Sequence, residues 1–175
     1  MRQVAFLRNV NQGQRGHPSS QDVLGAFRDA GCAEVVCFQS NGTVIFDADP
    51  VPEIVAEVMV SLAARSGAER EGFAIPLQEL ERIVRRHADA TDMSRRELTL
   101  HSGGMIDRTN GAVVRRAAQR RCVIVDAGVG WVATADERAR ESNATQVVER
   151  ITGAPATSRG LPTLLRLLDR FPPIM

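Results

Sequence analysis

Polar and basic side chains gather where an apolar run ends near the start of the chain. Arg8, Asn9 and Asn11 follow that run and precede Ser19-Ser20, either of which can cap a helix. Backbone N–H groups at a helix N-terminus bind anions, and Arg8 or Arg15 would add positive charge. The pattern predicts a small anionic ligand at this loop. The alternative is a solvated loop whose Asn side chains bond to the neighbouring backbone.

Two further stretches carry groups of the same kind. Gln39 and Ser40 lie between two apolar runs and would present an amide and a hydroxyl to a ligand, although turn chemistry alone also explains them. Thr157, Ser158 and Arg159 stand just before a helical pattern, which again suits an anion, and helix capping beside a surface arginine is the alternative. These stretches and the first loop supply the candidate ligand residues, and no catalytic residue is predicted.

The residue types exclude several mechanisms. The chain has no Lys and no Tyr, so a Schiff-base lysine, a phosphate-loop lysine and a tyrosine acid are all absent. The three histidines, His17, His87 and His101, form no recognisable Ser–His–Asp or Cys–His set. The densest basic cluster would suit the phosphates of a nucleic acid, but the net charge is only +1, which favours a solvated helix face. That cluster comprises Arg115, Arg116, Arg120 and Arg121.

Cysteine usage and hydropathy predict a protein of the cytoplasm. The cysteines number three, Cys32, Cys37 and Cys122, and this odd number in a chain without a secretory signal favours reduced thiols. No CxxC or HxxxH spacing is present, so we expect neither a metal nor an organic cofactor. No apolar run reaches the roughly 18–20 residues of a membrane span, and we expect no membrane partner.

The order of predicted elements in the first half is βαββαβ, the split-βαβ or ferredoxin-like pattern. Asn41-Gly42 predicts a tight hairpin, because both residue types tolerate positive φ. Pro50 and Pro52 are expected to open the second helix. The expected strands are 3–7, 34–38, 43–46 and 73–75, and the expected helices run from Ser19 or Ser20 to Gly31 and over 53–65.

The second half predicts βαββα, with 156–158 as the candidate closing strand and a final helix over 161–171. Ser142 is expected to cap a helix that Gly153 stops. The remaining expected helices are 77–88 and 109–119, and the remaining strands are 97–101, 122–125 and 130–133. The fold class predicted is therefore α+β, with two packed ferredoxin-like subdomains, 1–76 and 77–175, antiparallel sheets and an extra C-terminal helix.

Topology suggests that two of the candidate patches stay apart. We expect the first and third strands of the first sheet to run parallel. That arrangement would place the turn at Gln39 and Ser40 at the opposite end of the sheet from Arg8.

The chain resembles the family known as domain of unknown function 1697. The resemblance rests on Leu-Arg-Asn-Val-Asn-Gln-Gly over 7–13 and on Gln-Ser-Asn-Gly-Thr-Val-Ile-Phe over 39–46. It also rests on Ser-Asn-Ala-Thr over 142–145 and Pro-Ala-Thr-Ser-Arg-Gly-Leu over 155–161. The resemblance implies a fold and no particular activity.

Three hypotheses on function remain open. The first is a small-molecule binding protein or enzyme that holds an anionic group. The second is a nucleic-acid-binding module with Phe6 and Phe46 as stacking aromatics, but aromatic residues total only 4%, and we do not expect this partner. The third is a structural protein, for example a homodimer formed through an exposed sheet face or edge.

Overall fold

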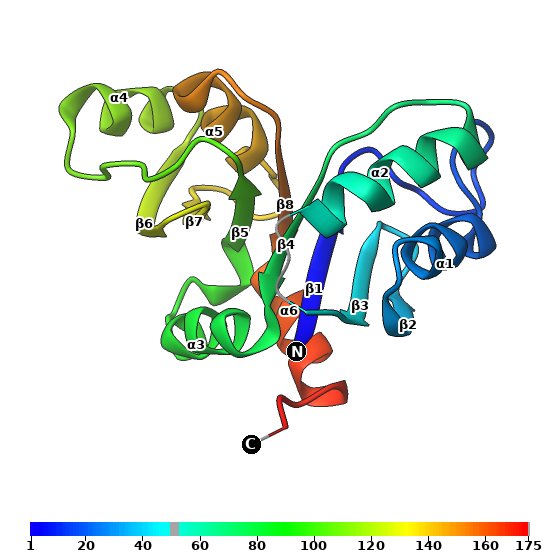
Figure 1. Cartoon of the computed structure of the whole chain (residues 1–175). Coiled ribbons are helices and arrows are strands. Elements are labelled where there is room, and N and C mark those ends of the chain that lie inside the picture. The colour runs from blue at the N-terminus through cyan, green and yellow to red at the C-terminus, as the bar shows by residue number, and fades with distance from the viewer. Residues whose placement is uncertain (50–52, 175) are drawn as a thin grey trace. The chain divides into compact units, whose positions relative to one another are not determined.

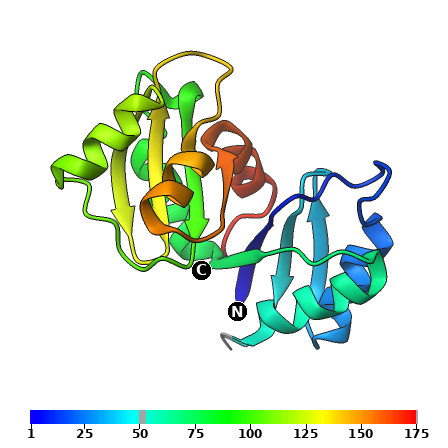
Figure 2. The same cartoon turned by 90° about the horizontal axis from the view of Figure 1, so that it is seen from above.

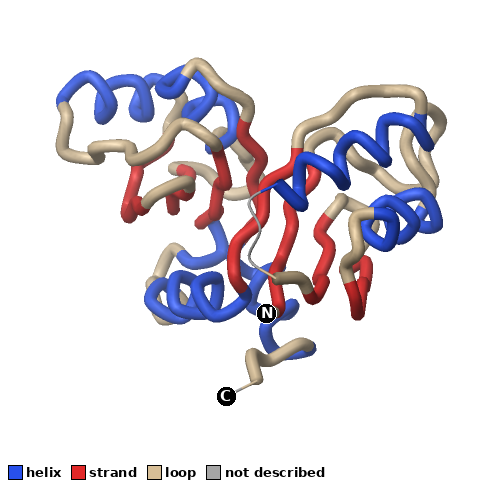
Figure 3. Tube along the Cα trace, viewed as in Figure 1, coloured by secondary structure: helices blue, strands red, loops and turns tan. Residues whose placement is uncertain are grey.

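A computed structural model describes residues 1–49 and 53–174. The chain divides into two compact units, Met1–Leu80 and Glu81–Met175. Each unit contains a four-stranded sheet in which every neighbouring pair of strands is antiparallel. Both units contain strands and helices interspersed along the chain (Figure 3). The predicted α+β fold with two ferredoxin-like halves is therefore confirmed.

The first unit has the element order βαββαβ (Figure 1). Its strands pair in the order β2-β3-β1-β4. The predicted helix start at Pro50 and Pro52 lies outside the described residues. The elements are β1 (Arg2–Leu7), α1 (Ser20–Asp29), β2 (Ala33–Phe38), β3 (Thr43–Asp47), α2 (Glu53–Ser66) and β4 (Gly72–Pro76).

The expectation that the first and third strands run parallel is wrong. β1 and β3 are antiparallel, with Phe6 opposite Thr43. In a split βαβ unit the crossover makes β1 and β2 parallel, and the β2–β3 hairpin then reverses the chain. β3 returns between them in the opposite direction. The end of β1 and the β2–β3 hairpin therefore lie at the same edge of the sheet, where the Leu7 N–H donates to the Gly42 carbonyl at 2.8 Å.

The hairpin differs in detail from the predicted Asn-Gly turn. Positive φ occurs at Gln39 (61°) and Gly42 (78°), and Asn41 is not among the described residues with positive φ. The loop thus spans four residues between β2 and β3. The Asn41 side chain accepts a hydrogen bond from the Thr43 hydroxyl at 2.8 Å, which fixes the exit of the loop.

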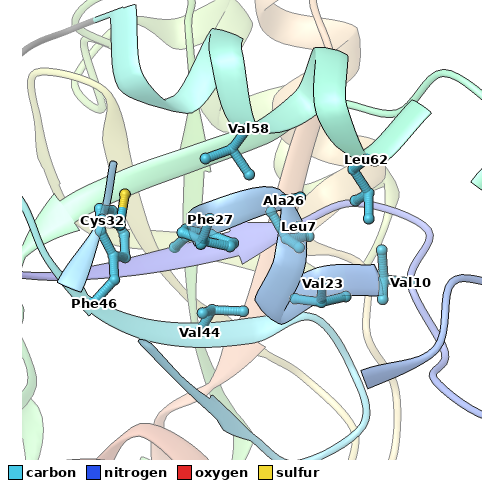
Figure 4. Packing of buried hydrophobic residues seen from close by; sticks show 11 residues of the cluster. Leu7, Val10, Val23, Ala26, Phe27, Cys32, Val44, Phe46, Val58 and Leu62 are labelled. Carbon is cyan, nitrogen blue, oxygen red and sulfur yellow. The ribbon is translucent and has the colours of Figure 1, made fainter. Parts of the chain in front are cut away.

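The core of the first unit lies between its sheet and helices α1 and α2 (Figure 4). α1 starts with a capping box in which the side chains of Ser19 and Asp22 each accept from the other's backbone N–H. Val23 and Phe27 are buried on its inner face, and Phe27 packs against Phe46 with ring centroids 4.9 Å apart. This packing fixes α1 on the sheet, and with it the loop that leads into α1.

The second unit repeats this order of elements. Its strands pair in the order β6-β7-β5-β8, and α4 and α5 lie side by side on the sheet (Figure 2). Helix α3 (Leu77–His87) leads into the unit. The other elements are η1 (Met93–Arg95), β5 (Arg96–His101), α4 (Gly111–Gln119), β6 (Cys122–Gly128), β7 (Trp131–Asp136), α5 (Ala144–Thr152), β8 (Ala156–Gly160) and α6 (Leu161–Arg170).

The start of α5 corrects the prediction that Ser142 caps this helix. Asn143 occupies the cap position, without a side-chain capping bond, and Ser142 donates to Glu97 instead. The Ser142 hydroxyl is bound to the Glu97 carboxyl group, so it is not available to accept from a backbone N–H at the start of the helix. At the other end, Gly153 stops α5 in the left-handed conformation (φ 69°), as predicted.

We predict that Gly42→Ala destabilises the first unit. An added Cβ would meet the Leu7 carbonyl oxygen at 2.9 Å and the Cβ atoms of Leu7 and Val10 at 3.0 Å. Gly67→Ala is the matched control, because Gly67 has nearly the same φ (77°) but open space around its Cβ position. Left-handed backbone costs each variant about 1–2 kcal/mol, and crowding adds about 1–3 kcal/mol for Gly42→Ala alone. Urea unfolding followed by circular dichroism measures both, and equal losses would contradict the crowding argument.

Candidate functional site

The first unit contains an open groove beside the start of α1, which we call the α1 groove. Its volume is about 560 Å³. Three separate segments line it: the loop after β1, the first residues at α1, and the end of β2 with the hairpin. The lining residues are Gln12, Gly13, Ser19, Ser20, Cys37, Gln39 and Ser40. Gln39 and Ser40, both predicted as ligand residues, therefore face the same groove as the loop after β1.

Backbone contacts hold the loop and the hairpin together. The Gln12 N–H donates to the Ser40 carbonyl at 2.8 Å. The Ser20 hydroxyl donates to the Gln12 side-chain carbonyl, also at 2.8 Å. The Gln12 amide nitrogen is buried, and its one acceptor among the described residues is the thiol of Cys37, which is a weak acceptor. A donor left with a weak acceptor at the edge of a groove is costly, and an oxygen acceptor supplied by a ligand would satisfy it.

The other predicted residues of this loop do not line the α1 groove. The Arg8 guanidinium lies 3.6 Å from the Glu71 carboxylate. The Asn9 carbonyl accepts from the Arg70 guanidinium at 2.9 Å, and the Asn11 N–H donates to the His17 ring at 3.1 Å. These contacts fix the path of the loop.

The three predicted residues near the C-terminus lie in strand β8 of the second unit. Arg159 is 8% exposed and pairs with Leu98 in the strand register. Its guanidinium donates to the Thr157 hydroxyl at 2.9 Å and to the Ser158 carbonyl at 2.8 Å. Burial lowers the pKa of Arg159 to about 10, so the side chain remains charged at neutral pH. Arg159 is thus a buried cation and not the surface arginine of the alternative interpretation.

A chain of hydroxyl groups joins the two C-terminal stretches of the family resemblance. The Ser158 hydroxyl lies 2.6 Å from the Thr99 hydroxyl and 2.7 Å from the Thr145 hydroxyl. Thr99 is on β5 and Thr145 is in the first turn of α5. The stretches 142–145 and 155–161 therefore meet at the N-terminus of α5.

Sequence reasoning missed a pair of buried acids at the same place. Glu97 on β5 is 8% exposed and Asp136 on β7 is 2% exposed. The Ser142 hydroxyl donates to Glu97 Oε1 at 2.6 Å, and the Asn143 N–H donates to Asp136 Oδ1 at 3.3 Å. The two carboxyls are also joined by a hydrogen bond, and the Ala144 N–H bonds to Glu97. No other donor among the described residues reaches Glu97 Oε2 or Asp136 Oδ2. Alternation along β5 was the available signal, because it puts Glu97 on the same face as Thr99.

This environment makes Glu97 a weak acid. Burial raises the pKa of Glu97 to about 7; the Ser142 hydrogen bond opposes the rise and the Asp136 carboxyl adds to it. Burial also raises the pKa of the nearby Cys122 thiol to about 12, with the Asp136 charge as a further cause. In the part of the chain that the structure describes, no group of three His, Cys, Asp or Glu side chains is placed to hold a metal ion.

The histidines have structural contacts. The ring of His87 lies between Arg96 Nη1, 2.6 Å from Nδ1, and Asp126 Oδ2, 3.2 Å from Nε2. The arginine can only donate, so Nδ1 accepts and Nε2 donates, and neither nitrogen is available as a base. His101 accepts from the Gly103 N–H at 3.1 Å, and burial lowers its pKa.

Three arginines of the basic cluster have partners within the fold, and the two candidate stacking aromatics are buried. Arg116 donates to the Arg150 carbonyl, Arg120 to the Gln146 side chain, and Arg121 forms a two-bond ion pair with Glu141. Phe6 and Phe46 are 0% and 2% exposed, so neither ring offers a stacking surface for a base.

The fold and these sites define a class: a two-unit α+β protein whose units each carry a ferredoxin-like sheet. The model of a family described as "Protein of unknown function (DUF1697)" matches residues 1–122, and the chain belongs to this family. A search among curated proteins found no significant match. The chain is also similar to the solved structure of conserved bacterial protein SP0830 from Streptococcus pneumoniae. The TM-score is 0.66 at 14% identity, over 97% of each chain, which shows a common fold.

Among the described residues, every helix is too short or too polar to cross a bilayer.

We predict that Glu97 makes the stability of the second unit fall as pH rises. From about 4.5 to about 7 the unfolded chain loses a proton that folded Glu97 retains, so the unfolded state is favoured by up to about 3 kcal/mol. Glu97→Gln removes this titration and adds an N–H donor for Asp136. The variant should have a flatter pH profile and exceed the wild type in stability at alkaline pH.

Urea unfolding monitored by Trp131, the single tryptophan of the chain and a residue of β7, measures this effect in the second unit. Glu69→Gln is the matched control at an exposed position, and it should keep the wild-type pH dependence. Parallel pH profiles for the wild type and Glu97→Gln would refute the prediction.

Proposed function

We propose that the first unit binds a small anionic ligand in the α1 groove. The observation that supports this most directly is the buried Gln12 amide nitrogen at the edge of the groove, whose one acceptor among the described residues is the Cys37 thiol, a weak one. None of the lining residues carries a carboxylate, so the walls do not repel an anion. The ligand would therefore supply acceptor oxygens to the side of the groove formed by Gln12 and α1.

The start of α1 provides further donors. The Asp22 carboxylate accepts a hydrogen bond from the Ser19 N–H, and the Ser19 hydroxyl accepts one from the Asp22 N–H. The intrahelical bonds begin with the Val23 N–H, which leaves the amides of Ser20 and Gln21 without an intrahelical acceptor. A single anionic group fits these two amides, and the nearby Asp22 charge limits its affinity to about the millimolar range.

The sequence-predicted residues take different parts in this proposal. Gln39 and Ser40 would contact the ligand from the hairpin side. Arg8, Asn9 and Asn11 would keep the loop in place through Glu71, Arg70 and His17. Thr157, Ser158 and Arg159 belong to the second unit and have no part in the α1 groove.

The test is thermal unfolding with inorganic phosphate as the probe, at constant ionic strength maintained with sodium chloride. A ligand that binds only the folded state raises the melting temperature. Ser20→Asp should remove at least half of that rise, because it puts a negative charge in the α1 groove. The same change suits the first turn of a helix electrostatically, so the variant should remain folded.

Ser94→Asp is the control for the charge change, since Ser94 is exposed and lies in the second unit. Ser94→Asp should show the same rise in melting temperature with phosphate as the wild type. It therefore controls for stabilisation by phosphate that does not depend on the α1 groove. If phosphate and chloride stabilise the wild type equally, or if Ser20→Asp responds like Ser94→Asp, the proposal is wrong.

A further inference from the structure

The side chains at the N-terminus of α5 form a sequence of donors and acceptors that ends at the surface. Ser142 is exposed, and its hydroxyl donates to Glu97 Oε1 at 2.6 Å. Glu97 and Asp136 lie below it and are at least nine-tenths buried. The order from surface to interior is serine, glutamate, aspartate.

Glu97 holds its proton next to Asp136. The two carboxyls are joined by a hydrogen bond, the Ala144 N–H also bonds to Glu97, and no basic side chain among the described residues pairs with either carboxyl. Two adjacent buried carboxylates repel one another, and a proton on Glu97 removes the repulsion. Once Glu97 has lost this proton, its Oε1 can accept the proton of the Ser142 hydroxyl.

Helix α5 begins two residues after Ser142, and its first turn contains unpaired amides. Its intrahelical bonds begin with the Val147 N–H, which donates to the Asn143 carbonyl at 3.1 Å. The amides of Thr145 and Gln146 precede this bond and have no intrahelical acceptor. Such amides, together with the positive end of the helix dipole, stabilise an oxygen that gains negative charge.

We propose that Ser142 is a nucleophile that accepts an acyl group from small uncharged esters, with Glu97 as its base and Asp136 as a positioning residue. This is the arrangement that acyl transfer requires: a nucleophilic hydroxyl, a base within hydrogen-bond distance and a third group that orients the base. The proposal is independent of the α1 groove in the first unit.

The chemistry balances with the ester and water alone. Ser142 Oγ attacks the ester carbonyl carbon and its proton passes to Glu97 Oε1. The bond from the carbonyl carbon to the leaving oxygen breaks, and Glu97 returns the proton to the leaving alkoxide. Water then attacks the acyl-Ser142 ester with Glu97 again as base, which releases the carboxylic acid and restores the serine.

The alternative is that Ser142 and the two acids only fix the start of α5. A structural role predicts loss of stability on substitution but no chemical reactivity at Ser142. A nucleophile predicts a covalent adduct whose formation depends on the ionisation of Glu97. The two interpretations therefore differ in a measurement that does not involve stability.

The test is incubation of the full chain with p-nitrophenyl acetate, followed by mass spectrometry and peptide mapping of the acetylated residue. The chain has no lysine, so few other groups compete for the reagent. We expect an acetyl adduct on Ser142, with a rate that rises as pH increases through about 7. Ser142→Ala should abolish this adduct, and Glu97→Gln should slow it about a hundredfold while removing the pH dependence.

Ser102→Ala is the matched control, because Ser102 is an exposed serine in the loop after β5 and outside the α5 cluster. It should leave acetylation of Ser142 unchanged. Circular dichroism of each variant establishes that it is folded. If Glu97→Gln does not fold, Asp136→Asn tests instead whether acetylation of Ser142 depends on the acid pair. No adduct on Ser142 at any pH, or an adduct that forms equally fast in Glu97→Gln, would overturn the proposal.

Discussion

Antiparallel pairing of the first and third strand of each sheet determines where everything else lies. It puts the end of β1 beside the β2–β3 hairpin, where the Leu7 N–H donates to the Gly42 carbonyl. The second unit repeats the contact, with the His101 N–H donating to the Gly130 carbonyl at 3.0 Å. Gly42 and Gly130 have φ values of 78° and 77°. The two units thus share a repeat in backbone structure that their residue types do not show. In the first unit, this pairing also brings together the segments that line the α1 groove.

The same register allows the two units to be compared position by position. Phe6 faces Thr43 in the first sheet as Leu100 faces Trp131 in the second. By this correspondence, Ala5 is equivalent to Thr99 and Phe46 to Thr134. At these two positions the helix-facing side of the first sheet is apolar, whereas that of the second carries threonine hydroxyl groups. One fold therefore supports a dry core in one unit and a hydrogen-bonded cluster in the other.

Much of the fold could be predicted from the sequence because its signals are local. Apolar periodicity gave the strands and helices, and Gly153 marked the end of α5. The errors arose where the structure depends on residues distant in the sequence. Chain reversal at the hairpin sets the direction of β3, and the four-residue hairpin has positive φ at Gln39 and not at Asn41. Ser142 donates to the buried Glu97 and therefore does not cap α5. The α1 groove could be predicted only in part, because Gln39 lines it while Arg8 binds Glu71.

The buried acids are the strongest sign that the second unit has a chemical task. Burying an ionisable group without a partner cation costs stability, and in a buried carboxyl pair each of the two groups carries this cost. The fold itself does not need a pair of acids, because in the same register Gln3 and Ala48 of the first unit occupy the positions of Glu97 and Asp136. A group that costs stability, that the architecture can replace, and that holds a serine hydroxyl at 2.6 Å is better explained by chemistry at that hydroxyl than by folding.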